Sequence, residues 1–343
     1  MKGGELLFVG LAGARPRAGE RRLLRRLQPG GVVLFARNVE DEAQLTALVA
    51  ELRALCPGAV VAMDAEGGRV DRLRELAGPA PAGEVLARLP ARISARAGRW
   101  MGAALAHFGF RLDLAPVVDL DRGRRDNALD GRCLGTQPRA VTSRARAFLL
   151  GLHAAGVGGC LKHFPGLGGA SRDTHRDAAP IMLGERDLAR DLSPFRALRD
   201  EADAVMAAHA AYPALDPSSA PATLSPALAR RLLRREVGYR GALLSDDLEM
   251  GALAPLGDLP ELAEAALAAG CDGLLVCSRL AAGPGIAERL AASPFAVRRA
   301  EAGSRLRRLA RRLARLRAQA PPPPSLEKIR AGLRALADSS AND

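Results

Sequence analysis

Titratable side chains stand at the ends of several short apolar runs of this chain: Asp64, Asp119, Lys162 with His163, His209, and Asp246 with Asp247. Any one of them could be an ordinary cap or turn residue. Ionisable groups next to buried segments are costly unless they line a cleft, so their repeated position outweighs that simple explanation. The pattern predicts one functional site to which several segments contribute.

A second set of candidates lies in the glycine-rich stretch that follows the apolar run Gly156–Phe164. Asp173 and His175 stand two residues apart there. A carboxylate beside an imidazole fixes its tautomer and raises its basicity, so the pair can donate and recover a proton near neutral pH. A long loop with several glycines beside a site is typical of a lid.

Asp246 is the best candidate for direct attack on a substrate. A carboxylate at the end of a strand can act as a nucleophile towards a sugar C1, or as a general base. Ser245 beside it is not in a G-x-S-x-G turn, so a serine hydrolase is disfavoured. No G-x-G-x-x-G and no G-x-x-x-x-G-K-[ST] occurs, which leaves nucleotide binding unsupported.

The elements that position these residues form a regular alternation. The apolar runs are continuous, as expected of strands that are buried on both faces. There are eight: Glu5–Leu11, Gly31–Phe35, Ala59–Asp64, Leu112–Asp119, Gly156–Phe164, Ala204–His209, Gly241–Asp247 and Gly273–Ser278. Helical periods lie between them: Asp41–Leu55, Gly83–His107, Pro138–Ala155, Ser225–Glu236 and Pro260–Ala269.

Strands that alternate with helices predict a parallel sheet. Eight such units favour a single TIM-like (β/α)8 barrel of the α/β class over an open, doubly wound sheet. In such a barrel the carboxyl ends of the strands meet on one face, which hosts the site. We therefore expect a catalytic barrel over residues 1–297, followed by a basic amphipathic helix over 298–319 and a proline-rich break with a short helical tail over 320–343.

The charge of the chain is concentrated near its C-terminus. The formal net charge is +12, and nine arginines with one acid fall between Arg298 and Arg317, so this segment supplies +8. Leucines recur there at helical spacing, at 306, 309, 313 and 316, which predicts a helix packed by its leucine stripe. We interpret the arginines as a solvated face. No aromatic residue interleaves them, which argues against a nucleic-acid site.

Composition bounds the remaining possibilities. The 343 residues are 48% hydrophobic and 26% charged, which is typical of a globular protein and excludes global disorder. No apolar run is long enough for a membrane span, and the N-terminus lacks a signal-peptide pattern, so we expect a cytoplasmic protein. The five cysteines are scattered without a C-x-x-C pair, which indicates neither disulfides nor structural zinc. We also expect a monomer.

Seven stretches carry a resemblance to a known family. They read PGGVVLFARN (29–38), DAEGGRVDR (64–72), LAPVVD (114–119), KHFPG (162–166), DTH (173–175), PATLS (221–225) and SDDL (245–248). In this order they resemble the β-N-acetylhexosaminidases of glycoside hydrolase family 3, of the NagZ type. The likeness covers most of residues 1 to about 290, and the KHFPG, DTH and SDDL stretches in this order are its most specific part.

The resemblance implies a retaining double displacement, with Asp246 as nucleophile and His175, supported by Asp173, as acid/base. It implies contacts to sugar hydroxyls and to an N-acetyl group from Asp64, Arg72, Arg132, Lys162 and His163. We expect His209 either to line the same pocket or to make structural hydrogen bonds. The implied substrate is a β-linked N-acetylglucosamine at the end of a cell-wall fragment, such as GlcNAc-anhydro-MurNAc with or without peptide. No cofactor or metal is needed.

The chain departs from the family pattern in one loop and leaves alternatives open. The family usually reads KHFPGHGD, whereas Leu167 and Gly169 replace the second histidine and the aspartate. The stretch around Arg132 is also a loose match. A phosphorylase of the same family remains an alternative, as does a muropeptide-binding sensor without turnover. A metal-dependent barrel hydrolase would have to use the candidate ligands Asp64, His163, His209 and Asp246.

Overall fold

A closed barrel of parallel strands forms the centre of the computed structural model, which describes residues 1–123, 127–170 and 180–341, with side chains up to residue 337. The strand order around the barrel is β1-β10-β9-β8-β7-β6-β3-β2. The bounds are β1 (Leu7–Val9), β2 (Gly31–Leu34), β3 (Val60–Met63), β6 (Leu112–Asp113), β7 (Gly158–Phe164), β8 (Ala204–Ala207), β9 (Ala242–Asp247) and β10 (Gly273–Val276). Each lies inside one predicted apolar run, which confirms the TIM-like barrel.

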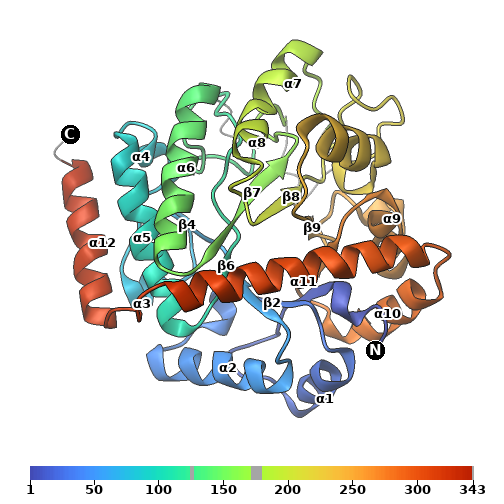
Figure 1. Cartoon of the computed structure of the whole chain (residues 1–343), viewed down its shortest axis with the longest axis horizontal. Coiled ribbons are helices and arrows are strands. Elements are labelled where there is room, and N and C mark those ends of the chain that lie inside the picture. The colour runs from blue at the N-terminus through green and yellow to red at the C-terminus, as the bar shows by residue number, and fades with distance from the viewer. Residues whose placement is uncertain (124–126, 171–179, 342–343) are drawn as a thin grey trace.

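Helices surround the barrel on its outside (Figure 1). They are α1 (Ala18–Leu27), α2 (Glu42–Leu55), α3 (Arg74–Ala77), α4 (Gly83–Leu86), α5 (Ala91–Phe108), α6 (Pro138–Ala154), α7 (Glu185–Asp191), α8 (Ser193–Leu198), the π-helix η4 (Ala227–Val237), α9 (Leu259–Ala269) and α10 (Gly283–Ala292). Single 3₁₀ turns add η1 (Gly4–Leu6), η2 (Ala36–Asn38), η3 (Ala222–Leu224), η5 (Ala254–Leu256) and η6 (Leu280–Ala282). Within the described ranges, no helix is long and apolar enough to cross a membrane.

Proline accounts for two differences from the sequence-based boundaries. The helical period predicted over Gly83–His107 is broken into α4 and α5, and Pro90 stands at the N-cap of α5. The run Leu112–Asp119 pairs in the barrel only through Leu112 and Asp113, because Pro116 cannot donate to a ladder. Pairing resumes in a single bridge between Val117 and Lys162. Helices α1, α7 and α8 are further elements that the sequence reading did not include.

A small antiparallel hairpin, β4 (Ala65–Gly67) with β5 (Val70–Asp71), follows β3 at the mouth of the barrel. It was not predicted. Gly67 has a φ of +86°, and a Cβ at this position would lie 2.1 Å from the carbonyl oxygen of Pro81. Only glycine fits such a backbone position, so this residue allows the hairpin to fold back over the barrel mouth.

Helix α11 (Ala296–Gln319) lies across the barrel, from α9 and α10 at one end to α6 at the other (Figure 1). Leu306, Leu309 and Leu313 are buried beneath it, as their spacing predicts. The solvated arginine face is only partly correct. Arg298 is buried and donates to Asp272, while Arg312 donates to Asp203. These two carboxylates immediately precede β10 and β8, so α11 is attached by ion pairs to the amino ends of the strands.

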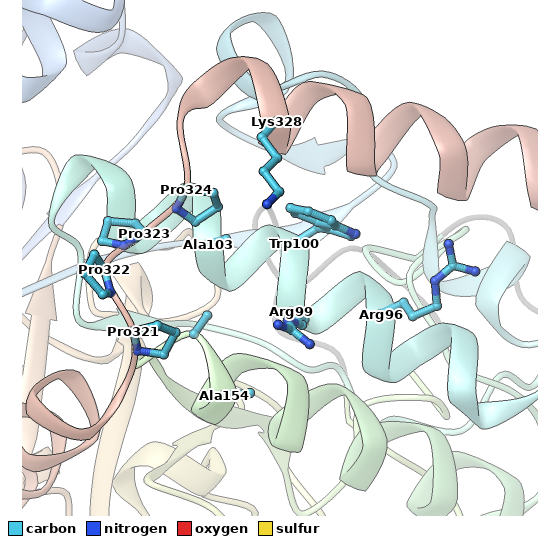
Figure 2. A pocket seen from close by; sticks show the side chains of 11 residues that line it. Arg96, Arg99, Trp100, Ala103, Ala154, Pro321, Pro322, Pro323, Pro324 and Lys328 are labelled. Atoms are coloured by element: carbon cyan, nitrogen blue, oxygen red, sulfur yellow. The ribbon is translucent and has the colours of Figure 1, made fainter.

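The C-terminal tail continues through Pro321–Pro324 into α12 (Leu326–Ala341), which packs along α5. Its buried residues are Leu326, Ile329, Leu333 and Leu336. Gly332 allows close contact, because a Cβ there would lie 2.2 Å from the ring of Trp100. A groove of about 560 Å³ remains beside the prolines, and Figure 2 shows Trp100, Arg96 and Arg99 from α5 together with Lys328 around it.

Candidate active site

A cavity of about 570 Å³ opens at the carboxyl ends of the barrel strands. Six of the predicted site residues line it: Asp64, Arg72, Arg132, Lys162, His163 and Asp246. Segments that are far apart in the sequence therefore converge at one face, as the ends of the apolar runs predicted. Asp173 and His175 lie outside the described residues.

The wall of the cavity contains a buried chain of ion pairs. Lys162 Nζ lies 2.6 Å from Asp64 Oδ1 and 2.6 Å from Glu66 Oε1. Glu66 also accepts two hydrogen bonds from Arg132, from Nε at 2.7 Å and from Nη2 at 2.8 Å. Arg132 Nη1 donates in addition to the carbonyl oxygen of Ala128 at 2.8 Å. The arrangement holds two cations and two carboxylates in fixed positions beside the cavity.

Charge compensation keeps the central groups of this chain ionised. Burial disfavours the charged form of Glu66, but Arg132 and Lys162 outweigh that effect and hold its pKa well below its usual range. For Lys162, burial acts to lower the pKa, and the neighbouring Asp64 and Glu66 carboxylates raise it above the ordinary value. The cavity therefore has a charged polar wall that is able to orient hydroxyl groups.

Glu66 is a functional candidate that the sequence reading missed. It lies on β4, two residues after Asp64, and both carboxylates contact Lys162. Residues two apart in an extended segment share a face, so the D-A-E spacing was a usable signal. Glu66 falls in the unpredicted hairpin, beyond the end of the apolar run, so the pattern of run ends does not include it.

Asp119 positions His163 from behind the cavity. Its carboxylate accepts hydrogen bonds from His163 Nδ1 at 2.7 Å and from the backbone N–H groups of His163 and Leu167. Because an ionised carboxylate only accepts, Nδ1 carries the proton, and Nε2 remains for the cavity side. Asp119 is thus a positioning residue, which fits its place at the end of an apolar run.

Asp246 stands at the end of β9, and its Oδ1 accepts from the backbone N–H of Asp247 at 2.8 Å. Burial alone would raise the pKa of its carboxyl. The positive fields of His209 and His163, the Asp247 N–H and Lys162 outweigh burial and place the pKa below the ordinary value. Asp246 is therefore an ionised carboxylate at neutral pH, as a nucleophile or a base requires.

His209 is not among the residues that line the cavity. Its side chain is buried, Nδ1 lies 2.8 Å from Thr223 Oγ1, and Nε2 donates to the carbonyl oxygen of Asp247 at 2.9 Å. The sequence left two roles open for His209, a place in the substrate pocket and a structural hydrogen-bonding role. In the structure both ring nitrogens are engaged by the protein, so His209 instead holds the strand end that carries Asp246.

Arg72 has an unused hydrogen-bond donor beside the cavity. Its Nε is buried without a hydrogen-bond partner among the described residues. A buried donor that is left unpaired costs free energy, and a ligand that accepts from it removes that cost. Arg72 is accordingly suited to bind a polar group of a substrate.

The two departures from the family pattern lie in a tightly packed stretch after β7. Leu167 is buried in the core, and its backbone N–H donates to Asp119. A Cβ on Gly169 would lie 2.6 Å from Leu183 Cδ1, so an aspartate does not fit there without movement. Apolar packing therefore takes the place of polar groups in this part of the loop.

Asp247 gives a prediction on stability. Burial, followed by the nearby carboxylates Glu249 and Asp246, raises its pKa to about 6. A raised carboxyl pKa means that stability declines as pH rises from about 4 through 6, since ionisation is easier in the unfolded chain. We expect Asp247→Asn to stabilise the protein by about 2 kcal/mol at pH 7 and by little near pH 4. Urea unfolding at both pH values tests this, and an equal effect at both contradicts it.

The described residues contain no group of three or more His, Cys, Asp or Glu side chains placed to hold a metal ion. The candidate ligands named above have protein partners instead: Asp64 binds Lys162, His163 binds Asp119, and His209 binds Thr223. The geometry thus gives a polar cavity with an ionised carboxylate at its rim and fixed cationic donors around it.

Comparison with known proteins places this chain among the glycosyl hydrolases. Residues 1–313 match the glycosyl hydrolase family 3 N-terminal domain. A β-hexosaminidase of Pseudomonas aeruginosa is 38% identical over 281 residues, which cover 81% of this chain and 83% of that protein. A β-hexosaminidase of Stenotrophomonas maltophilia is 41% identical over 283 residues, covering 79% and 83% respectively.

Solved structures give the same result. NagZ from Neisseria gonorrhoeae, in complex with N-trifluoroacetyl-D-glucosamine, superposes with a TM-score of 0.83 at 30% identity and covers 100% of this chain and 98% of its own. A family 3 β-N-acetylglucosaminidase from a Paenibacillus species reaches a TM-score of 0.90 at 29% identity, over 98% of this chain and 68% of that one.

Proposed function

Since the chain belongs to glycosyl hydrolase family 3 and is a glycosidase of the β-hexosaminidase type, we propose that it releases terminal β-linked N-acetylglucosamine from peptidoglycan fragments with retention of configuration. The observation that carries the mechanism is Asp246, an ionised carboxylate that lines the cavity and is held by the Asp247 N–H. The unmatched donor of Arg72 and the charged wall around Lys162 support a polyhydroxylated substrate.

In the proposed reaction the Asp246 carboxylate attacks C1 of the sugar while His175 donates a proton to the departing glycosidic oxygen. The C1–O bond breaks, and a covalent glycosyl-enzyme forms on Asp246. His175, oriented by Asp173, then takes a proton from water, which attacks C1 and releases Asp246. The sugar leaves in its original β configuration.

The cavity wall supplies the binding contacts in this proposal. Asp64 and Lys162 hold adjacent sugar hydroxyls, and Arg72 donates to a polar group of the sugar, while Glu66 and Arg132 keep Lys162 in place. His163 donates or accepts through Nε2. A cavity of about 570 Å³ accommodates a terminal sugar with part of its aglycone. The five cysteines are all free, in agreement with action in the cytoplasm.

Hydrolysis of two chromogenic substrates tests the proposal. We expect release of 4-nitrophenol from the β-N-acetylglucosaminide in preference to the β-glucoside, because buried contacts to a required acetamide give strong selectivity. Activity should survive a chelator and should give free sugar in both phosphate and non-phosphate buffers. Formation of sugar 1-phosphate would instead establish a phosphorylase, and binding without any product would establish a sensor.

A prediction on His175 separates the acid role from binding. We expect His175→Ala to reduce kcat/KM by about 10²- to 10⁴-fold on a muropeptide substrate, whose leaving alcohol needs a proton. The loss should be much smaller with 4-nitrophenyl N-acetylglucosaminide, whose phenolate leaves unaided. Initial rates on both substrates measure this, and equal losses would argue against an acid/base role.

A further inference from the structure

A second pocket of about 480 Å³ lies on the barrel floor, the face at the amino ends of the strands and opposite to the catalytic cavity. It is formed where η4 meets the start of α11, and Gly270, just before β10, forms part of its base. Five arginines line it: Arg230, Arg234, Arg235, Arg298 and Arg305. The family mechanism uses none of them.

The charge of this pocket is not balanced by the protein. Glu301 and the buried Asp272 are the carboxylates that its arginines contact in the described part of the chain. Five arginines against two carboxylates leave a formal charge of +3. A phosphomonoester carries about −1.5 to −2 at pH 7, so it matches this excess better than a single carboxylate does.

One of the arginines, Arg298, has a buried donor without a hydrogen-bond partner among the described residues. Arg298 uses Nη2 for the carbonyl oxygens of Gly270 and Cys271 and for Asp272 Oδ1. Its Nη1 is buried and has no hydrogen-bond partner in the described ranges. The carboxylate of the half-exposed Glu301 lies 3.8 Å from Arg298 Nη1 and also 3.8 Å from Arg305 Nη1. An oxyanion that displaced Glu301 would come within bonding distance of both guanidinium groups.

The backbone at the start of α11 also favours the binding of an anion in this pocket. Helix α11 has 24 residues, and no side chain caps its N-terminus. The free N–H groups and the dipole of such a helix end attract anions, yet the first turn carries Arg298 and Arg299 and no acid. Two exposed apolar side chains, Phe295 and Val297, flank this helix end in the pocket. They offer contact area to the organic part of a ligand.

We propose that this floor pocket binds a phosphorylated small molecule, with its phosphoryl group between Arg298, Arg305 and Arg235 and its organic part against Phe295 and Val297. In the absence of the ligand, Glu301 occupies the place beside the buried guanidinium of Arg298, so its carboxylate competes with the phosphoryl group for this arginine. The groove beside the prolines in Figure 2 also has three cations, Arg96, Arg99 and Lys328, but none of its described residues has a buried hydrogen-bond donor without a partner.

The test is calorimetric titration of the full chain with phenyl phosphate and with inorganic phosphate, at constant ionic strength. We expect Arg235→Gln to weaken binding about fivefold, since the exposed Arg235 side chain makes no hydrogen bond or ion pair within the described residues and would supply one charge-assisted contact to the ligand. Glu301→Gln should tighten binding about threefold by removing the competing carboxylate. The charge-matched control Arg99→Gln, in the groove of Figure 2, should have no effect.

The outcomes decide the assignment. Opposite shifts in Arg235→Gln and Glu301→Gln place the ligand on the floor, because both positions lie at the other end of the barrel from Asp246. Equal weakening by Arg235→Gln and Arg99→Gln, or no binding of either phosphate, overturns the proposal. Tighter binding of phenyl phosphate than of inorganic phosphate supports the apolar contact, whereas equal binding refutes that part.

Discussion

Replacement of Asp246 by alanine is expected to reduce kcat/KM for 4-nitrophenyl N-acetylglucosaminide by about 10⁴-fold, because it removes the carboxylate that forms the glycosyl-enzyme. Added azide should restore part of the activity and yield the α-glycosyl azide, since a small anion can occupy the space left by the side chain. Steady-state rates and NMR spectra of the product measure both effects. For the unmodified protein, NMR at early times should show the β-anomer as the first sugar released.

The neighbouring residue provides a matched control. Asp247→Asn keeps an oxygen that can accept from the backbone N–H groups of Glu249 and Cys277, so the strand end stays in place. We expect this variant to lose less than about tenfold in kcat/KM. If Asp247→Asn is as inactive as Asp246→Ala, or if azide restores nothing and the α-anomer appears first, Asp246 is not the nucleophile.

Replacement of Glu66 by alanine is expected to cost about 3–5 kcal/mol of unfolding free energy, because it leaves Arg132 without its carboxylate and Lys162 with only Asp64 in a buried site. Denaturant unfolding at pH 7 measures the loss. The exposed Glu288, which lies 3.8 Å from Arg26, is the matched control, and Glu288→Ala should cost less than about 1 kcal/mol. Similar losses in the two variants would contradict the role given to Glu66.

The pH dependence of this effect follows from the sign of the pKa shift. The folded-state pKa of Glu66 lies below its ordinary value of 4.5, so its contribution is complete above that value and declines as pH falls below it. We expect the difference between the unmodified protein and Glu66→Gln to shrink between pH 5 and pH 3. A difference that grows in acid would mean that Glu66 is not ionised in the folded state.

The barrel could be predicted from the sequence because each strand lies in a continuous apolar run, and several of these runs end in a polar residue. That pattern gave the site as well, since the carboxyl ends of parallel strands must share one face. The boundaries of the helices were harder to predict from the sequence. The apolar period across Pro90 continues without interruption, so only the missing N–H and the fixed φ of proline separate α4 from α5.

Partnerships between side chains were harder to predict than positions. His209 ends an apolar run just as His163 does, yet one supports a strand end from inside the protein and the other lines the cavity. The difference depends on which neighbours are within reach, and a linear pattern does not contain that information. The same holds for Arg298 and Arg312. Their spacing predicts the side of the helix on which they lie, but it does not predict their ion pairs with Asp272 and Asp203.

The ion pairs that attach α11 to the barrel floor determine the stage of synthesis at which this part of the fold can form. Asp203 precedes β8, but its partner Arg312 is synthesised 109 residues later. Asp272 likewise precedes its partners Arg298 and Arg305 in the chain, so it is synthesised before them. In a ribosome-bound chain that already contains all eight strands, Asp203 can pair with His153 and Asp272 with Arg234, but both carboxylates still lack their arginine partners from α11. Release of α11 from the exit tunnel adds these ion pairs, so this helix can be attached to the barrel only after all eight strands have been synthesised.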